Sequence, residues 1–478
     1  MAEKVYDVVV IGGGPGGYVA AIRAAQLGLK VACVEAQKLG GVCNNWGCIP
    51  TKAMLESANY ARTLTNGLGD FGIEFGDLKL DIGTAAKRAG KIADSGAKGV
   101  SFLFRKNKID HIEGWGRLLG DGKIEIDPGK NAGHGDEKPS GKGKKEVIEA
   151  KNIILATGSR PRELPILKID GDRVWSSDHA VYAEKAPKSL AVIGGGAIGL
   201  EFADVFNSFG TEVTVIEAMD HILPLEDPDV ARVVERAFKK RGMKVLSGAM
   251  LEKADVSKKG VKLTVKVGDK KETIEVERVL SAVGRVPVIE DIGLEAAGVK
   301  TENGFIAVDE KMRTNVEGIF AIGDCAKPPL LAHKASHEGV AAAEFIAGDP
   351  NAGVDYNNIP SVTYCHPEVA SVGMTEAEAK EAGYDIEVGS FPWSASGRAR
   401  TMGDTDGFVK VIRDKKYSEL LGAHIVGPHA SELIAEFVVG RHLETTVEEM
   451  NSAIHPHPTL SESAAEAALA ALGRAINM

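Results

Sequence analysis

Two glycine-rich loops with the same surroundings constrain the fold of this chain more than any other feature. The first is the run Ile11-Gly-Gly-Gly-Pro-Gly-Gly-Tyr-Val-Ala-Ala, and the second is Ile193-Gly-Gly-Gly-Ala-Ile-Gly-Leu-Glu-Phe-Ala. Each loop follows an apolar strand and opens a helix, and a second strand then ends in an acid, Glu35 or Glu217. This order is that of a dinucleotide-binding βαβ unit. A tight turn without a ligand is the weaker explanation for a motif that occurs twice, so the chain is predicted to hold two dinucleotide-binding domains.

The glycines of each loop allow a tight turn and bring a pyrophosphate against a helix N-terminus, where unpaired N–H groups favour anions. They are Gly12, Gly14 and Gly17 in the first unit, and Gly194, Gly196 and Gly199 in the second. We expect Glu35 and Glu217 to bind ribose hydroxyls. The Glu217 carboxylate would repel a 2′-phosphate, and residues 218–224 contain no arginine. The second site is therefore predicted to prefer NAD(H) to NADP(H).

Length and composition bound the class of protein. A chain of 478 residues is too long for one core and predicts about three or four domains. The net charge of −10 argues against nucleic acid as a main partner. The chain has no run of eighteen apolar residues, so no membrane span is predicted. Nor does the N-terminus read as a secretion signal. The odd number of cysteines, 5, does not resemble a secreted disulfide framework.

A pair of cysteines follows the first βαβ unit, in the run Gly-Gly-Val-Cys43-Asn-Asn-Trp-Gly-Cys48-Ile-Pro-Thr-Lys52. Four intervening residues are the wrong spacing for most zinc sites, and no second ligand pair stands nearby, so no metal is predicted. In an ideal helix the two Cα atoms would lie roughly 8 to 9 Å apart, whereas a disulfide tolerates about 7 Å. A disulfide therefore requires a distorted helical turn, for which Gly47 and Pro50 are suited. Two free buried thiols are the alternative.

A dithiol beside a bound nucleotide indicates redox chemistry. The nucleotide of the first site should carry an electron acceptor next to the sulfur atoms, and a flavin is such an acceptor. The first site is therefore predicted to bind FAD.

Apolar strands that end in short turns divide the rest of the chain. The segments 153–161 and 279–287 each read as a buried strand that leaves a domain, and 318–324 reads as a return to the first domain. We predict helices at 332–345, 431–442 and 461–475. Residues 119–147 read as a solvated excursion, and from about residue 351 strands and helices mix. The predicted limits are 1–160 and 284–350 for the FAD domain, 161–283 for the NAD domain and 351–478 for a C-terminal α+β domain.

Two histidines lie between prolines near the C-terminus, in the run Ile454-His455-Pro456-His457-Pro458-Thr459-Leu460-Ser461-Glu462. An imidazole oriented by a carboxylate is the usual general base for a thiol. Taken alone, such a run is more often a rigid loop. A metal site at these two histidines is not predicted, because no cluster of cysteines or acids accompanies them.

Together these motifs resemble the flavin disulfide reductase family, from Tyr6 to beyond Glu462. The resemblance also rests on Ala156-Thr157-Gly158, Ile322-Gly323-Asp324, Leu331-Ala332-His333-Lys334-Ala335 and His457-Pro458-Thr459-x-Ser461-Glu462. It implies an α/β fold of two Rossmann-like domains, one for FAD and one for NAD, and a C-terminal α+β dimerisation domain. In the redox motif, Asn44, Asn45 and Trp46 depart from the usual run, and the excursion near 120–147 is longer than usual.

The resemblance also implies roles for individual residues. Cys43 and Cys48 would form the redox-active disulfide, with Cys43 nearer the substrate and Cys48 nearer the flavin. Lys52 would approach the flavin and pair with Glu201. His457 would be the base and Glu462 its orienting carboxylate. The remaining FAD-site residues would be Gly116, Thr157, Gly158, Ser159, Asp324, Ala332 and His333, and Gly284 would line the NAD site.

Within the family, the chain is similar to members that oxidise protein-bound dihydrolipoamide to lipoamide and reduce NAD⁺ to NADH. This implies a cytoplasmic homodimer in which the histidine acts across the subunit boundary. The implied partners are the lipoyl domains and core of 2-oxo acid dehydrogenase complexes. Two alternatives remain at this point: a glutathione-type reductase that uses NADPH, and a flavoprotein binding subunit of a multienzyme complex. A mercuric reductase is disfavoured because the C-terminus lacks a cysteine pair.

Overall fold

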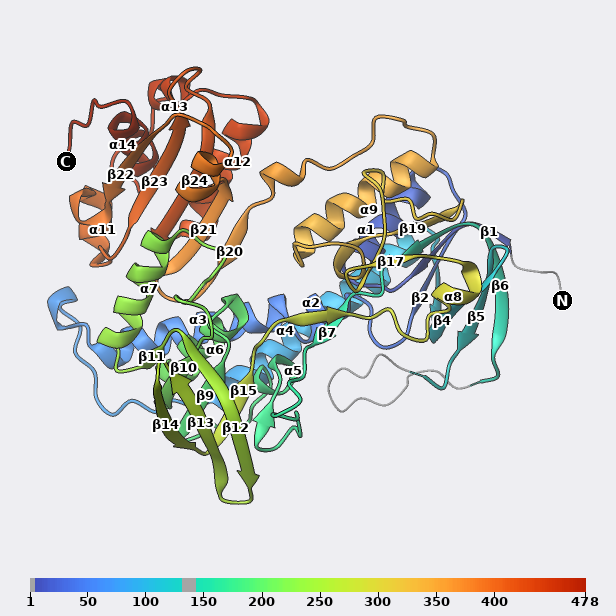
Figure 1. The fold of residues 1–478 in the computed structure, drawn as a ribbon, viewed down its shortest axis with the longest axis horizontal. Helices are drawn as coiled ribbons and strands as arrows, with labels where there is room; N and C mark the ends of the chain where they lie inside the picture. The colour runs from blue at the N-terminus through green and yellow to red at the C-terminus, as the bar shows by residue number, and fades with distance from the viewer. Residues whose placement is uncertain (1–4, 131–142) are drawn as a thin grey trace.

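The first sheet of the computed structural model, which describes residues 5–130 and 143–478, is built around the first glycine unit (Figure 1). Its strand order is β3-β2-β1-β6-β5-β4, and β19 pairs with residues 153–155 of β6 on the side away from β1. The strands are β1 (Val5–Ile11), β2 (Val31–Glu35), β3 (Asp110–Glu113), β4 (Trp115–Gly120), β5 (Lys123–Asp127), β6 (Glu146–Leu155) and β19 (Ile319–Ala321). The pairs β1–β2, β2–β3, β1–β6 and β6–β19 are parallel.

Helices cover this sheet, and α1 and α9 lie side by side against it (Figure 1). They bury small side chains such as Ala20, Ala24 and Ala342, which lets the two helices approach closely. The helices of this part of the chain are α1 (Pro15–Gln26), α2 (Gly41–Asn45), α3 (Cys48–Asn66), α4 (Ile82–Lys106), α8 (Leu294–Ala297) and α9 (Ala332–Ile346).

The second glycine unit forms a parallel sheet of its own, with the order β11-β10-β9-β15-β8. An antiparallel sheet of β12, β13 and β14 packs beside it. The strands are β8 (Val174–Trp175), β9 (Ser189–Ile193), β10 (Glu212–Ile216), β11 (Lys244–Leu246), β12 (Ala249–Ser257), β13 (Gly260–Val267), β14 (Lys270–Val276) and β15 (Arg278–Ser281). The helices are α5 (Ser177–Ala180), α6 (Ala197–Ser208) and α7 (Pro228–Lys240).

Two short antiparallel strands connect these units. The chain leaves the first sheet through β7 (Ser159–Pro161) and returns beside it through β16 (Arg285–Pro287). It then passes through β17 (Thr301–Glu302) and β18 (Phe305–Ile306) and rejoins the first sheet at β19. The predicted limits of the domains remain predictions, but the second unit is inserted in the first.

The C-terminal part is an antiparallel sheet of five strands, in the order β20-β21-β24-β23-β22, covered by helices (Figure 1). Its strands are β20 (Ser361–Thr363), β21 (Glu368–Gly373), β22 (Ile386–Pro392), β23 (Phe408–Asp414) and β24 (Leu420–Gly427). Its helices are α10 (Glu376–Glu381), α11 (Gly397–Met402), α12 (Ala430–His442), α13 (Val447–Ser452) and α14 (Glu462–Ala471). The α/β class with a separate α+β part is as predicted.

Two local predictions need correction. Residues 119–147 are not a solvated excursion throughout, because 123–127 form β5, in which Ile124 and Ile126 are buried. Their two-residue spacing between polar neighbours is the signal of a half-buried strand. One part of the expected excursion, 131–142, lies outside the described residues. The last helix ends at Ala471 rather than at Ala475. Gly473 follows this end with a positive φ of 69°, a backbone conformation that terminates helices.

Within residues 5–130 and 143–478, no helix is long and apolar enough to cross a lipid bilayer.

Candidate active site

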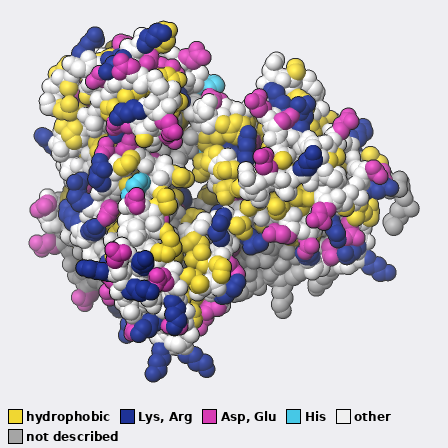
Figure 2. Space-filling model, viewed as in Figure 1, with side chains coloured by type: hydrophobic (Ala, Val, Ile, Leu, Met, Phe, Trp, Pro, Cys, Tyr) yellow, Lys and Arg dark blue, Asp and Glu magenta, His cyan; other side chains and the backbone are white. Residues whose placement is uncertain are grey.

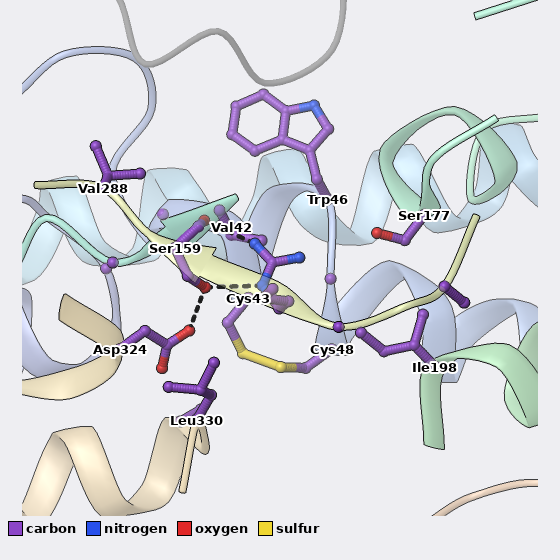
Figure 3. Close-up of a pocket in the computed structure, with 18 of the residues that line it drawn as sticks. Val42, Cys43, Trp46, Cys48, Ser159, Ser177, Ile198, Val288, Asp324 and Leu330 are labelled. Atoms are coloured by element: carbon purple, nitrogen blue, oxygen red, sulfur yellow. Dashed lines mark hydrogen bonds between the residues drawn. A yellow bond between two sulfur atoms is a disulfide. The ribbon is translucent and has the colours of Figure 1, made fainter. Parts of the chain in front are cut away.

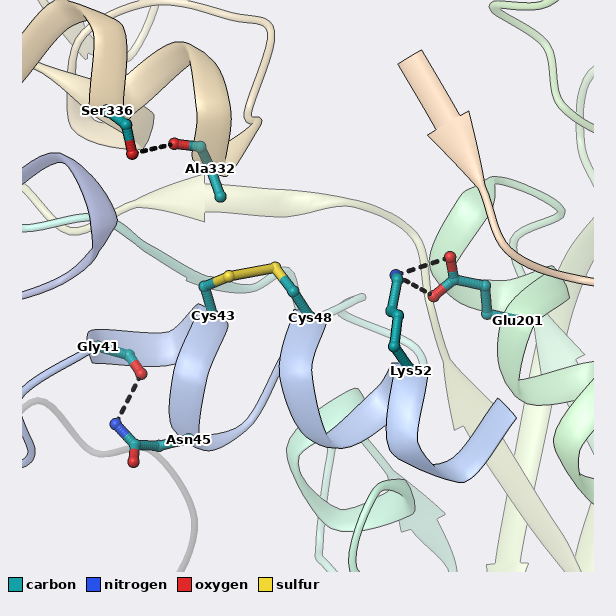
Figure 4. Close-up of a disulfide and its surroundings, with 8 residues drawn as sticks. All are labelled: Gly41, Cys43, Asn45, Cys48, Lys52, Glu201, Ala332 and Ser336. Atoms are coloured by element: carbon teal, nitrogen blue, oxygen red, sulfur yellow. Dashed lines mark hydrogen bonds and ion pairs between the residues drawn. A yellow bond between two sulfur atoms is a disulfide. The ribbon is translucent and has the colours of Figure 1, made fainter. Parts of the chain in front are cut away.

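Cys43 and Cys48 lie on the two sides of a break between α2 and α3 (Figure 4). Their Cα atoms are 4.7 Å apart and their sulfur atoms form a disulfide. The break is at Gly47, where a Cβ would come within 3.1 Å of the Val42 carbonyl oxygen. Pro50 lies in the first turn of α3, where its missing N–H costs nothing. The disulfide therefore spans two helices rather than one distorted turn, and the alternative of two free thiols is wrong.

The amide of Asn45 holds α2 in place. This side chain is buried, and its Nδ2 donates to the carbonyl oxygens of Leu39 at 3.1 Å and Gly41 at 2.9 Å. The hydroxyl of Tyr182, from the second unit, donates to the Asn45 carbonyl oxygen at 2.5 Å. Trp46 is buried, since only 5% of it is exposed, and it lines the cavity described below. The backbone of the redox motif is thus fixed from both units, and nothing in the sequence signalled Tyr182.

Lys52 forms the ion pair that we expected with Glu201 of α6 (Figure 4). Its Nζ lies 2.8 Å from each carboxylate oxygen. Glu201 is buried and also accepts a hydrogen bond from the backbone N–H of Tyr364 at 3.0 Å. The Lys52 Nζ lies 4.5 Å from the centre of the Tyr364 ring. All three parts of the fold therefore meet beside the disulfide.

One cavity of about 1010 Å³ is lined by the disulfide and by residues of both glycine loops. Figure 3 shows some of the lining residues around the disulfide, and hydrophobic side chains gather around a hollow at the middle of the molecule in Figure 2. Most of the predicted site residues line it: Gly12, Gly14, Glu35, Cys43, Cys48, Lys52, Gly116, Thr157, Gly158, Ser159, Gly194, Gly196, Glu201, Glu217, Gly284, Asp324 and Ala332. The predicted residues outside the lining are Gly17, Gly199, His333, His457 and Glu462.

The glycines of the loops have two different tasks. A Cβ on Gly17 would collide with the carbonyl oxygen of Gly12, and one on Gly199 with that of Gly194, so these glycines permit close packing behind the loop. Gly14 and Gly196 line the cavity, and a Cβ would meet nothing within 4 Å on Gly196 and only the Cα of Gly41, at 3.9 Å, on Gly14. Each precedes the first turn of a helix whose N–H groups have no side-chain cap. Both loops therefore fit a pyrophosphate.

Glu35 and Glu217 brace the two loops in the same manner. Oε2 of Glu35 accepts from the Gly13 N–H at 2.7 Å, and Oε2 of Glu217 accepts from the Gly195 N–H at 2.6 Å. Oε1 of Glu217 also accepts from the Met219 N–H at 2.7 Å. Both acids line the cavity where ribose binding was predicted. Their bracing of the glycine loop adds a structural role that the sequence did not indicate.

The Glu217→Ala variant tests this second loop. We expect kcat/KM for NAD⁺ to fall by about tenfold or more, because a charged hydrogen-bond acceptor is lost, whereas kcat/KM for NADP⁺ should not fall in parallel. The measurement is kcat/KM with each coenzyme. Glu212→Ala, at the exposed start of β10, is the matched control. Equal losses with both coenzymes would contradict a role for Glu217 in their discrimination.

Asp324 is held by a chain of hydrogen bonds (Figure 3). The Ser159 hydroxyl donates to Oδ2 of Asp324 at 2.5 Å, and Nε of Arg285 donates to the Ser159 hydroxyl at 2.8 Å. Arg285 also donates to the Ser159 carbonyl oxygen at 2.7 Å and lines the cavity. Arg285 was missed by the sequence analysis, because only the pairing of β7 with β16 brings it to Ser159.

His457 and Glu462 form a pair at the start of α14, away from the cavity. The His457 Nδ1 lies 2.8 Å from Oε1 of Glu462, and the His457 side chain is 80% exposed. Burial opposes ionisation of Glu462, but the Thr459 N–H at 2.7 Å and the His457 ring together lower its pKa. His455 is engaged elsewhere, with its Nε2 2.7 Å from Glu436. Within one chain, therefore, the histidine and the disulfide are not brought together. His333 also points elsewhere, to the Pro360 carbonyl oxygen at 2.9 Å.

This combination of two dinucleotide-binding units with a disulfide between them defines a class of oxidoreductase, and comparison with known families agrees. Residues 6–339 match the model of the pyridine nucleotide-disulphide oxidoreductases, and residues 359–468 match the dimerisation domain of the same proteins. The chain belongs to this family. Membership of this family confirms the predicted fold class, the predicted cofactors FAD and NAD, and the prediction that the chain is an FAD-dependent oxidoreductase. The match to the dimerisation domain supports a homodimer.

Individual relatives are similar over the whole chain. A protein of Rhizobium etli named dihydrolipoyl dehydrogenase is 48% identical over 100% of both chains. One of the same name from Zymomonas mobilis is 46% identical over 99% of both. Among solved structures, LpdA of Mycobacterium tuberculosis superposes with a TM-score of 0.88 at 28% identity, over 97% of this chain and 99% of that one.

Proposed function

We propose that this chain is a dihydrolipoyl dehydrogenase, which oxidises protein-bound dihydrolipoamide to lipoamide and reduces NAD⁺ to NADH. The observation that carries the proposal is the position of the Cys43–Cys48 disulfide in one cavity with both glycine loops. The names of the full-length relatives support the substrate. Glu217 and its uncharged neighbours Ala218 and Met219 support NAD⁺ over NADP⁺.

The residues present fit FAD in the first unit. Gly12 and Gly14 would hold its pyrophosphate, Glu35 a ribose and Asp324 the ribityl chain, with Cys48 and Lys52 at the flavin end. Bound FAD would supply a two-electron acceptor between the dithiol and the nicotinamide. The Glu201 carboxylate keeps the Lys52 ammonium at this end of the cavity.

The chemistry of the disulfide is an exchange between thiols. A base removes a proton from one thiol of dihydrolipoamide, and the resulting thiolate attacks Cys43, so that the Cys43–Cys48 bond breaks and a mixed disulfide forms. The second substrate thiol then attacks the mixed disulfide and releases lipoamide, which leaves Cys43 and Cys48 reduced. Two electrons thereby pass to the protein. They leave it as a hydride on NAD⁺, and one proton is released.

We assign the role of base to the partner's His457. The His457 of each chain is exposed on the part of the fold that matches the dimerisation domain, and its Nδ1 is paired with Glu462. That pairing leaves Nε2 as the atom to take the substrate proton. An exposed, oriented imidazole is what a second subunit can present to the cavity.

We further propose that the enzyme works in the cytoplasm with the lipoyl domains and core of 2-oxo acid dehydrogenase complexes. The names of the relatives support these complexes as partners, since a protein-bound lipoyl group must be carried to the cavity by another protein. The three other cysteines are free and buried, as a reducing compartment allows.

A visible spectrum tests the function directly. Anaerobic addition of dihydrolipoamide to the FAD-loaded protein should produce a long-wavelength band from a thiolate beside the flavin, and NAD⁺ should then remove it. NADPH-dependent reduction of oxidised glutathione, with no response to dihydrolipoamide, would instead support a glutathione-type reductase. A flavin that responds to neither substrate would support a binding subunit.

A further inference from the structure

A fully buried ion pair lies directly behind the turn that carries Asp324. The Lys334 Nζ is 3.1 Å from Oε2 of Glu338, one turn further along α9, and both side chains are 0% exposed. Neither residue lines the cavity. Burying two charges costs several kcal/mol per ion, and an apolar pair of similar size often serves stability as well. Their presence therefore calls for a reason other than stability.

The pair holds the backbone on both sides of Gly323. The Gly323 N–H donates to Oε2 of Glu338 at 2.7 Å, and the Gly323 carbonyl oxygen accepts from the Lys334 Nζ at 3.2 Å. That carbonyl belongs to the peptide bond that leads into Asp324. Gly323 has a positive φ of 70°, so the direction of the next residue depends on these two contacts.

Two further contacts complete the network. The Lys334 Nζ also donates to the Lys327 carbonyl oxygen at 2.5 Å, which closes the turn from its far side. The Tyr356 hydroxyl donates to Oε1 of Glu338 at 2.7 Å. Each carboxylate oxygen of Glu338 and the ammonium of Lys334 thus has a partner, which is the condition for such a network to orient its surroundings.

We infer that Lys334 and Glu338 are positioning residues for the flavin half of FAD. They set the direction of Asp324 and join it to the first turn of α9, where Ala332 and Ala335 line the same cavity. The adenosine half depends on Gly12, Gly14 and Glu35, which the pair does not touch. This inference rests on the proposed binding of FAD and adds the residues that position it.

The test compares FAD with ADP, which represents the adenosine half alone. The double variant Lys334→Met with Glu338→Gln removes both charges and keeps an acceptor for the Gly323 N–H. We expect the Kd of the apoprotein for FAD, measured by flavin fluorescence, to rise roughly tenfold or more. The inhibition constant of ADP against FAD rebinding should stay within about twofold, because the glycine loop is unchanged.

The matched control is Arg23→Met with Glu344→Gln, which removes an ion pair of 2.7 Å between α1 and the far end of α9. It should leave both constants unchanged. An unchanged FAD Kd in the first variant overturns the inference, as does an equal loss of FAD and ADP, which would show a general structural role. Failure of the unmodified chain to bind FAD would instead refute the proposed function.

A second variant serves if the double variant does not fold. Tyr356→Phe removes only the hydroxyl that orients Glu338. We expect FAD binding to weaken by about threefold with ADP unchanged, as for the loss of one ordinary hydrogen bond. No change in the FAD Kd would then overturn the inference.

Discussion

The Cys48→Ser variant should lose dihydrolipoamide oxidation, with kcat reduced by roughly 10³-fold or more. A serine at position 48 cannot form the disulfide with Cys43, so the substrate thiolate has no sulfur–sulfur bond to attack. NADH oxidation by artificial acceptors should persist in part, because the glycine loops and the Lys52–Glu201 ion pair are untouched. Both activities are measured on the FAD-loaded variant.

Cys365→Ser is the matched control, since Cys365 is a free and buried cysteine outside the cavity lining. It should retain most of both activities. Loss of NADH oxidation together with lipoamide turnover in Cys48→Ser would contradict the order in which we place the disulfide and the flavin.

The His457→Gln variant should slow the thiol half-reaction by roughly 10²-fold or more, the usual contribution of a general base. Glutamine can keep a hydrogen bond to Glu462 but cannot accept a proton. The measurement is the rate at which dihydrolipoamide reduces the flavin in a stopped-flow experiment. His455→Gln changes the neighbouring histidine, which contacts Glu436 instead, and should have a much smaller effect. An unchanged rate in His457→Gln would refute its role as base.

A hybrid dimer separates action across the subunits from action within one chain. Chains with Cys48→Ser and chains with His457→Gln would each have little activity as homodimers. A dimer with one of each contains one complete site if the histidine acts on its partner, and none if it acts on its own chain. Recovery of about half of the unmodified activity supports the assignment across the subunit boundary, and the absence of recovery refutes it.

Local patterns were sufficient for the parts of the site that depend on neighbours in the chain. The strand, loop and helix around Gly12 and around Gly194 follow from glycine, β-branched residues and spacing alone. The buried strand at 123–127 was missed because its two isoleucines lie within a stretch that is otherwise polar. Lys52 and Glu201 were paired only through the family resemblance, since no local pattern connects α3 with α6.

The sequence alone determined the two dinucleotide-binding units, their acids and the cysteine pair beside the first of them, because these depend on short-range geometry and on residue type. Only the tertiary structure showed that both loops and the disulfide share one cavity, that Tyr182, Arg285 and Tyr364 hold the redox motif and its surroundings, and that Lys334 and Glu338 lie behind Asp324. Those contacts join residues from separate elements, and long-range packing leaves no periodic signal in a single sequence. The same limit applies to His457, because its side chain is exposed in one chain and we assign its role to the active site of a second chain.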